Sequence, residues 1–342
     1  MLGFFAIIPI EGTTLAMDWK GLWAGIKDGV IQYGDAQTGL RIPPWSIVVL
    51  LPLGFLPFRL SWGLLALVTL AVLIISVPDA PKSLRIFAIF ALATSYPTLR
   101  TIADGNLEAL VIVGALLLVY GFDYGSPAAV IAGILLIATK IQESWILLLI
   151  LPFFMFSQLE KPQNVRVILG VLAIVAVSLF WKGREWIEAV LVIEQRGSIM
   201  DSSLWACASR WGVSFPLAAL AGLAIFGGTV ATGLRNRNHL SNELIGFLIA
   251  ASLLLAPYAA GNSYLTPLAL GVVPLFLNSP LLGLALVLLA NAPYLVIHQR
   301  ELLYWWSAAY WTLLLLLTWA ILGIDLWQRP WQPNASAPLP RR

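Results

Sequence analysis

Charged residues, cysteine and histidine are all scarce in this chain. Of its 342 residues only 11% are charged, one is cysteine (Cys207) and two are histidine (His239 and His298). A single cysteine excludes an intramolecular disulfide and a cysteine-based zinc site. The two histidines form no HExxH or HxxxH pair, so a histidine-rich metal or haem site has no support. Because no basic stripe with interleaved aromatic residues is present either, we expect no nucleic-acid partner.

Apolar residues are abundant instead. They make up 60% of the chain, and the mean hydropathy is +0.87, whereas a soluble domain is roughly 45–50% apolar and 25% charged. The apolar residues form continuous runs without the alternation of a membrane β-barrel. They predict an all-α, polytopic membrane protein with about 11–12 membrane helices, several of them short for a bilayer. Short helices at membrane depth are typical of proteins that enclose a cavity.

The distribution of Lys and Arg predicts the orientation in the membrane. Loops 78–85, 121–127, 158–166 and 234–243 and the C-terminal segment share one face, where basic residues outnumber acidic ones, so this face is expected to be cytoplasmic. The long polar loops 11–44 and 181–212 are then external. We expect one helical domain over 1–324 and a disordered, Pro-rich cytoplasmic tail over 325–342. The apolar segment 1–10 is too short to span. It is either a short, buried helix or, as we favour, part of a longer first span.

The first external loop contains an amphipathic pattern. Trp19, Trp23, Ile26 and Val30 recur at helical spacing, which predicts a helix lying on the membrane interface. Asp18 stands where this helix would begin. It is either a helix N-cap or a carboxylate beside the mouth of a cavity, available as a general base.

A second polar cluster opens a later helix on the same face. Asp104 and Glu108 are four residues apart and project from one helix face. Acidic residues in a first turn also suit the helix dipole, which is the structural explanation. Alternatively Asn106 and the N-terminal amides bind a hydroxylated or anionic ligand.

Lys140 lies between two apolar runs with no real loop. It is either a lysine that snorkels to the interface or, with Glu143 close by, a group that meets a phosphate. Among the charges of loop 181–212, Arg210 is the better ligand candidate because it adjoins the next apolar run. The break at 257–264 exposes backbone and small polar groups, as cavity linings do. No Walker A, GxGxxG, GxSxG or HExxH motif is present, so nucleotide hydrolysis, dinucleotide chemistry and zinc proteolysis have no support.

The order of several short motifs resembles that of bacterial membrane glycosyltransferases of the GT-C superfamily, above all glycosyltransferase family 87 and its uncharacterised relatives. The similarity covers about residues 18–277. It is carried by Asp18-Trp19, Ile42-Pro43-Pro44, the Leu-Pro-Leu-Gly-Phe-Leu-Pro stretch at 51–57, Gly105-Asn106-Leu107-Glu108, Lys140, Asp201-Ser202-Ser203-Leu204 and Ala256-Pro257-Tyr258-Ala259-Ala260.

The resemblance implies an inverting transferase that takes a hexose, mannose first of all, from a polyprenyl-phosphate donor. The acceptor would be a membrane lipid or glycan hydroxyl on the external face of the bacterial cytoplasmic (inner) membrane. It implies Asp18 as the catalytic base, and Lys140, Arg100 and Arg210 as groups that bind the donor phosphate. The remaining polar residues near the expected cavity are candidates for substrate binding: Asp104, Asn106, Glu108, Gln142, Tyr258 and Asn262. No cofactor is expected, and a divalent metal has no support in the sequence.

Two other classes of function stay open. A transporter or lipid flippase would contain inverted repeats and charges near the middle of the bilayer, and no repeat is visible in the sequence. A non-catalytic subunit of a membrane complex would present apolar interfaces rich in small residues and no cavity.

Overall fold

The computed structural model of the chain describes residues 15–27, 42–191, 201–296 and 300–328. Within these ranges the backbone is helical almost throughout, and the only β-pairing is an isolated bridge between Asp201 and Ala260. The longer helices are α2 (Met17–Lys27), α3 (Pro44–Gly54), α4 (Phe58–Ser76), α5 (Lys82–Ala93), α6 (Tyr96–Asp104), α7 (Glu108–Asp123), α8 (Pro127–Ile137), α9 (Ile141–Gln158), α10 (Lys161–Leu191), α12 (Phe215–Arg235), α13 (Asn242–Leu255), α16 (Pro280–Asn291) and α17 (Arg300–Gln328).

Shorter helical segments connect them. They are η1 (Ala138–Lys140), α11 (Leu204–Arg210), η2 (Gly261–Tyr264), α14 (Leu265–Pro267), the π-helical turn η3 (Leu268–Val272), α15 (Val273–Asn278) and η4 (Ala292–Val296). The all-α prediction is therefore confirmed for the described residues. Helix α17 continues to Gln328, beyond the domain boundary expected at 324, while 329–342 lie outside the described residues, as does the apolar segment 1–10.

Five helical stretches are long and apolar enough to cross a membrane, which supports a polytopic membrane protein. A sixth is obtained if α5 and α6, bent by 46°, count as one span. The described residues thus contain fewer full-length spans than the 11–12 expected, because several apolar runs form helices of 10–17 residues. Helix α13 is the clearest example: its residues from Leu244 to Leu254 are all buried inside the protein, and a helix that faces protein all round need not match the bilayer.

Helices α7 and α8 pack closely, and the chain reverses direction twice between the start of α7 and the end of α9. Glycine allows the approach of α7 to α8, since a Cβ at Gly114 would lie 2.7 Å from the backbone nitrogen of Ile137. The second reversal occurs at Lys140, whose φ of −124° and ψ of 78° interrupt the helix. The side chain of Gln163, just after α9, donates to the carbonyl of Gly125, just before α8. A straight helix over Pro127–Gln158 would separate its ends by about 48 Å, so the chain must reverse direction between α8 and α9.

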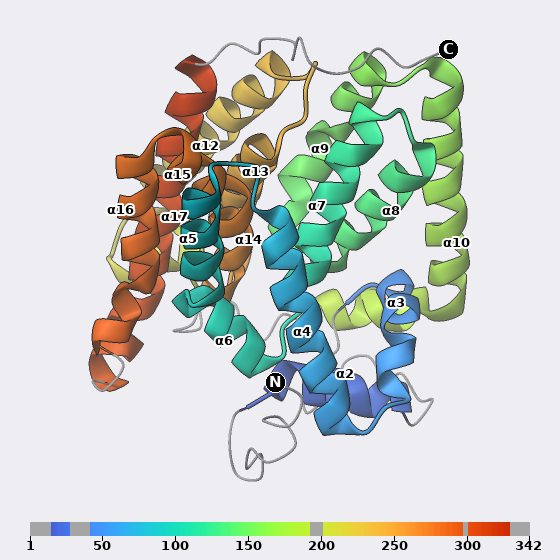
Figure 1. Cartoon of the computed structure of the whole chain (residues 1–342), viewed down its shortest axis with the longest axis horizontal. Coiled ribbons are helices and arrows are strands. Elements are labelled where there is room, and N and C mark those ends of the chain that lie inside the picture. Colours follow the sequence, from blue (N-terminus) through green and yellow to red (C-terminus); the bar gives the residue numbers. More distant parts are fainter. Residues whose placement is uncertain (1–14, 28–41, 192–200, 297–299, 329–342) are drawn as a thin grey trace.

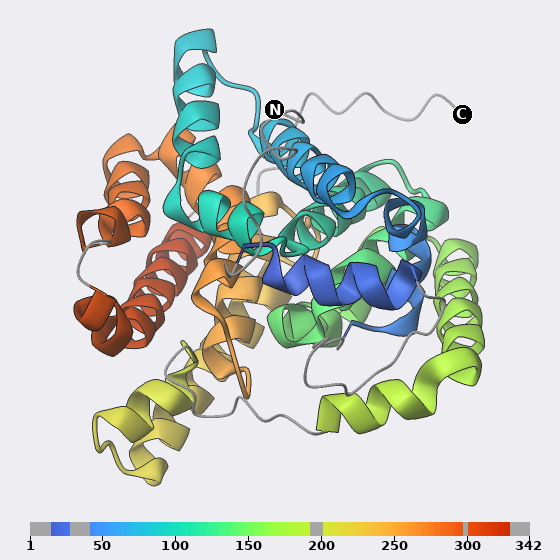
Figure 2. The same cartoon turned by 90° about the horizontal axis from the view of Figure 1, so that it is seen from below.

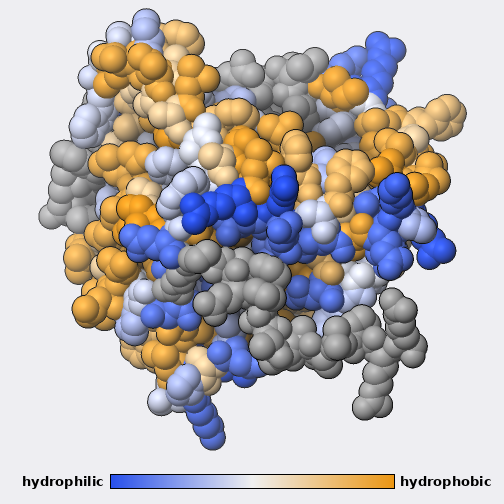
Figure 3. Space-filling view, turned by 90° about the horizontal axis from the view of Figure 1, so that it is seen from above, coloured by the Kyte–Doolittle hydropathy of each residue, from blue (hydrophilic) through white to orange (hydrophobic). Residues whose placement is uncertain are grey.

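The helices form a bundle with a separate layer across one end (Figures 1 and 2). Helices α2 and α3 and the last part of α10, beyond a kink at Lys182, make up this layer at the lower end of Figure 1. The loops expected on the cytoplasmic face and the C-terminal end of α17 lie toward the opposite end. Figure 3 shows that opposite end, where hydrophilic side chains form a band between apolar ones. The grouping of loops therefore agrees with the predicted topology.

Helix α2 confirms the amphipathic helix predicted from the tryptophan spacing. Its apolar face, with Trp19, Leu22 and Ile26 buried, packs against α3 and α4 of the protein rather than on a lipid surface. The indole of Trp19 also donates to the hydroxyl of Ser61, at 3.1 Å. Val30, the last residue of the predicted pattern, lies outside the described residues. Docking on α3 and α4 fixes the position of the first turn of α2, which contains Asp18.

Candidate functional site

The candidate site begins at the turn between α6 and α7, directly against α2. Gly105 ends α6 in the left-handed conformation (φ 70°), which glycine adopts without the steric cost that other residues bear. A Cβ at Gly105 would lie 2.5 Å from the Cβ of Trp19, so glycine also allows α2 to approach. As a result the Asn106 amide donates to the Asp18 carboxylate over 3.1 Å.

Asp18 is not the N-cap of α2, although its position in the sequence suggests that role. It lies inside the first turn of α2, which starts at Met17, and its carboxylate accepts a hydrogen bond from the Asn106 side chain. The side chain is exposed to solvent, yet the surrounding protein is dense, and this desolvation raises the pKa of Asp18. The positive charges of Lys140 and Arg100 and the Asn106 hydrogen bond oppose the rise. A carboxylate with a raised pKa is a stronger base than an ordinary aspartate.

Arg100 supplies positive charge beside Asp18. Its Nε donates to Oδ2 of Asp104, one turn further along α6, at 2.7 Å. The guanidinium side chain keeps 41% of its surface exposed, against 14% for Asp104. Arginine has five donor N–H groups, so one ion pair leaves others able to bind an anion.

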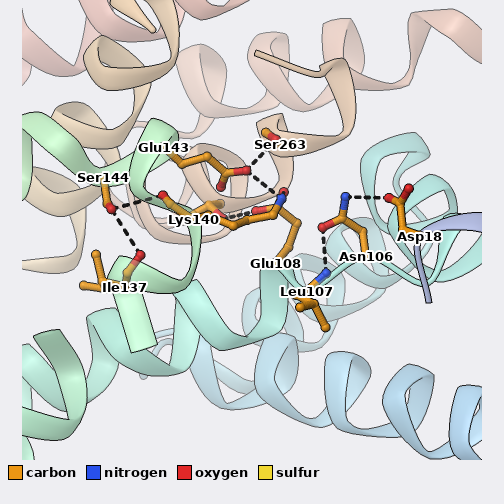
Figure 4. A network of polar contacts seen from close by, with 10 residues as sticks. Asp18, Asn106, Leu107, Glu108, Ile137, Lys140, Glu143, Ser144 and Ser263 are labelled. Atoms are coloured by element: carbon orange, nitrogen blue, oxygen red, sulfur yellow. Dashed lines mark hydrogen bonds and ion pairs between the residues drawn. The ribbon is translucent and has the colours of Figure 1, made fainter. Parts of the chain in front are cut away.

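Behind the Asp18–Asn106 pair lies a charged triad formed by Glu108, Lys140 and Glu143 (Figure 4). The Lys140 ammonium donates to Oε1 of Glu108 and, at 2.6 Å, to Oε1 of Glu143. Both glutamate side chains are completely buried, and Lys140 retains 11% exposure. Three helical segments contribute: the first turn of α7, the reversal at η1 and the first turn of α9. The reversal at Lys140 is what brings all three charges together.

Two hydroxyl groups from a distant part of the chain complete the triad. Ser263 of η2 donates to Oε1 of Glu143 at 2.6 Å, and Thr266 of α14 donates to Oε2 of Glu108 at 2.8 Å. Ser263 belongs to the sequence break already singled out as a cavity lining. Thr266 was missed, because a lone threonine in an apolar run gives no signal of a partner so far away in the sequence.

The triad changes the interpretation of Lys140. Its ammonium donates to two buried carboxylates and is therefore directed into the protein in this structure rather than along its surface. Glu108, predicted to bind substrate, is buried and accepts hydrogen bonds from Lys140 and Thr266. Its influence on the exposed part of the site is electrostatic, through Asp18.

Four further predicted site residues are not labelled in Figure 4: Gln142, Tyr258, Arg210 and Asn262. Gln142 is exposed, and Tyr258 is partly buried. Arg210 ends α11, where its charge acts on Cys207 of the same helix. The side chain of Asn262 lies outside what the structure describes. Within the described ranges no three or more His, Cys, Asp or Glu side chains are grouped so that they could hold a metal ion.

No protein-family model, no curated protein and no solved structure matches this chain. The activity must therefore be argued from the residues of the site itself.

Proposed function

We propose that the chain is an integral membrane glycosyltransferase similar to the GT-C enzymes of family 87. It moves a hexose, mannose first of all, from a polyprenyl-phosphate donor to an acceptor hydroxyl, with inversion at the anomeric carbon. The observation that supports this proposal best is the meeting of Asp18 with Asn106, 88 positions away in the sequence, beside the positive charge of Arg100.

Asp18 is suited to the role of general base. A sugar or lipid hydroxyl must lose its proton as its oxygen attacks the anomeric carbon, and a carboxylate within hydrogen-bond reach can take that proton. The structure provides an exposed carboxylate, held by Asn106 and backed by the packed face of α2. Because α2 is anchored through Trp19 and Ile26, the carboxylate has a fixed direction toward its substrate.

Arg100 is suited to stabilise the leaving group. As the glycosidic bond breaks, negative charge develops on the polyprenyl phosphate, and a nearby cation stabilises it. The guanidinium of Arg100 is partly exposed and matches phosphate geometry. Lys140 donates its hydrogen bonds to the buried glutamates, so it would contribute to this stabilisation through its charge alone.

The outer surface of the bundle suits a lipid-linked donor. Only 17% of the most apolar part of α10 is buried, and large side chains such as Leu169, Val177 and Phe180 are exposed. Such surfaces face acyl chains when a protein is embedded in a bilayer. We place the active end, where α2 docks, on the external side of the bacterial inner membrane, because the basic loops lie at the other end.

One observation favours the transporter alternative. Buried ionisable groups in membrane helices commonly mark ion or proton pathways, and the charged triad is such a group. No comparable observation favours the non-catalytic subunit.

Transfer of label distinguishes these functions. Membranes with the chain and matched membranes without it are incubated with a panel of radiolabelled polyprenyl-phosphate hexoses, and the label is followed into lipid or glycan products. Covalent transfer that depends on the chain supports the enzyme. Movement of intact donor across sealed vesicles without any new glycosidic product would contradict it and favour the transporter.

A further inference from the structure

The charged triad contains two acidic groups and one basic group. With all three ionised, the buried cluster would have a net charge of −1, although both glutamates have no exposed surface. An uncompensated charge in such surroundings is costly, and buried groups commonly neutralise instead. One bound proton would make the cluster electrically neutral.

The contacts of the two carboxyl groups are arranged differently. Glu108 uses both oxygens as acceptors, Oε1 for Lys140 and Oε2 for Thr266, as an ionised carboxylate does. In Glu143, by contrast, Oε1 accepts from both Lys140 and Ser263. Its Oε2 is buried and has no hydrogen-bond partner among the described residues. A protonated carboxyl group fits this pattern, because its carbonyl oxygen can accept both bonds while its hydroxyl accepts none and donates instead. The Glu108 carboxylate, which acts on Glu143 through a side-chain hydrogen bond as well as through its charge, is the group that can accept the hydrogen bond from this hydroxyl.

We infer that the triad is a proton-binding site and that its proton resides on Oε2 of Glu143 at neutral pH. Lys140 and Glu108 then form the single ion pair, and Glu143 takes part as a neutral acid. The ligand of this site is a proton, held at the junction of α7, η1 and α9 and separate from the exposed carboxylate of Asp18.

The charges around Glu143 agree with this assignment. The charged groups that act on it are Glu108 from α7 and Lys140 from η1. Helix α13 runs antiparallel to α9, because Ser252 near its end bonds the backbone of Ile146 near the start of α9. Glu243, in the first turn of α13, is therefore at the far end. Helix α8 carries no ionisable residue.

Helix α12 also brings no charge to the triad. Its residue Gly233 lies against Ile150 of α9, two turns beyond Glu143. Arg235 ends α12 further in the same direction and stacks on the ring of Trp327.

Helix α10 packs on α9 as well. Its Lys161 and Arg166 lie near its start, next to the far end of α9, while Lys182 and Arg184 pair with Glu185 and Glu188 of α10 itself. Among the described residues, Lys140 is therefore the cation that acts on Glu143.

Infrared spectroscopy of the full-length protein in lipid vesicles tests the assignment at pH 7. The C=O stretching band of a protonated carboxyl group lies at higher frequency than the bands of ionised carboxylates, and it shifts when H₂O is replaced by D₂O. We expect a band equivalent to one carboxyl group per protein that disappears in Glu143→Gln. Asp18→Asn and Asp123→Asn serve as controls, because burial raises the pKa of both these aspartates, and the assigned band should persist in each.

Two hydroxyl variants keep the test valid if Glu143→Gln fails to fold. Ser263→Ala removes a hydrogen bond to the carbonyl oxygen of the protonated acid, so the band should move to higher frequency. Thr266→Ala, its matched control, removes a bond to the ionised Glu108 and should leave the band in place. A shift in Thr266→Ala but not in Ser263→Ala would move the proton to Glu108 and overturn the assignment. Absence of any carboxyl band at pH 7 would refute the proton site altogether. Neither result depends on glycosyl transfer.

Discussion

Replacing Lys140 with methionine tests how the charged triad contributes to stability. The substitution keeps an unbranched side chain of nearly the same length but removes the ammonium from between Glu108 and Glu143, both fully buried. Removing one partner of a buried ion pair leaves an uncompensated charge and costs about 3–5 kcal/mol. We therefore expect the free energy of unfolding to fall by about 3–5 kcal/mol, measured by denaturant titration in detergent micelles with tryptophan fluorescence as the signal.

Lys182→Met is the matched control. Lys182 also pairs with a glutamate three residues on, but Glu185 is 47% exposed, and exposed pairs contribute about 0–1 kcal/mol. The double variant Lys140→Met with Glu108→Gln removes both charges of the buried pair and should recover most of the loss, since neutral replacement of a buried pair is often tolerated. Equal unfolding free energies for Lys140→Met and Lys182→Met, or no recovery in the double variant, would refute the reasoning.

Three further predictions concern the site and the packing. Arg100→Gln removes a charge that lowers the pKa of Asp18, so the acidic limb of the pH–transfer profile should move to higher pH. An unchanged acidic limb would show that the charge of Arg100 does not act on the catalytic group. The pKa of Asp18 is raised above 3.8 in the folded protein, so between pH 3.8 and the folded pKa the native state binds more protons than the unfolded state. The contribution of Asp18 to the free energy of unfolding should therefore fall as the pH rises through this range. This slope should be smaller in Asp18→Asn, as denaturant titrations across that range would show. Gly246→Ala places a Cβ 2.6 Å from the backbone of Gly271 and should lower the free energy of unfolding by about 1–3 kcal/mol. Gly227→Ala, with nothing within 4 Å, should raise it by about 0.5–1 kcal/mol. Similar unfolding free energies for the two variants would contradict the close packing of α13.

Periodicity and charge predicted the local features of the site well. The spacing of Trp19, Trp23 and Ile26 predicted α2, and the position of Lys140 between two apolar runs corresponds to the reversal between α8 and α9. Both signals are local, because helical spacing and an interrupted apolar run are visible within a dozen residues. The same approach placed Asp18 at the start of its helix but could not show that Asn106 would be its partner.

The number of spans and the partners of the triad could not be obtained in this way. Hydropathy counts an apolar helix equally whether it faces lipid or protein, and α13 is buried among other helices of the chain. Ser263 and Thr266 lie 120 and 158 positions from the glutamates they bind. Such pairings depend on how the helices pack, and no spacing within a single helix indicates them.

The most direct test of the central claim is mannosyl transfer in native membranes by Asp18→Asn. Transfer from labelled polyprenyl-phosphate mannose is compared with that of the wild type and of Asp79→Asn, an acid that is 97% exposed and pairs with Arg85 near the opposite end of the bundle. We predict that Asp18→Asn abolishes transfer while the protein remains folded, and that Asp79→Asn retains the wild-type rate. Transfer by Asp18→Asn at the wild-type rate would contradict the assignment of Asp18 as the base.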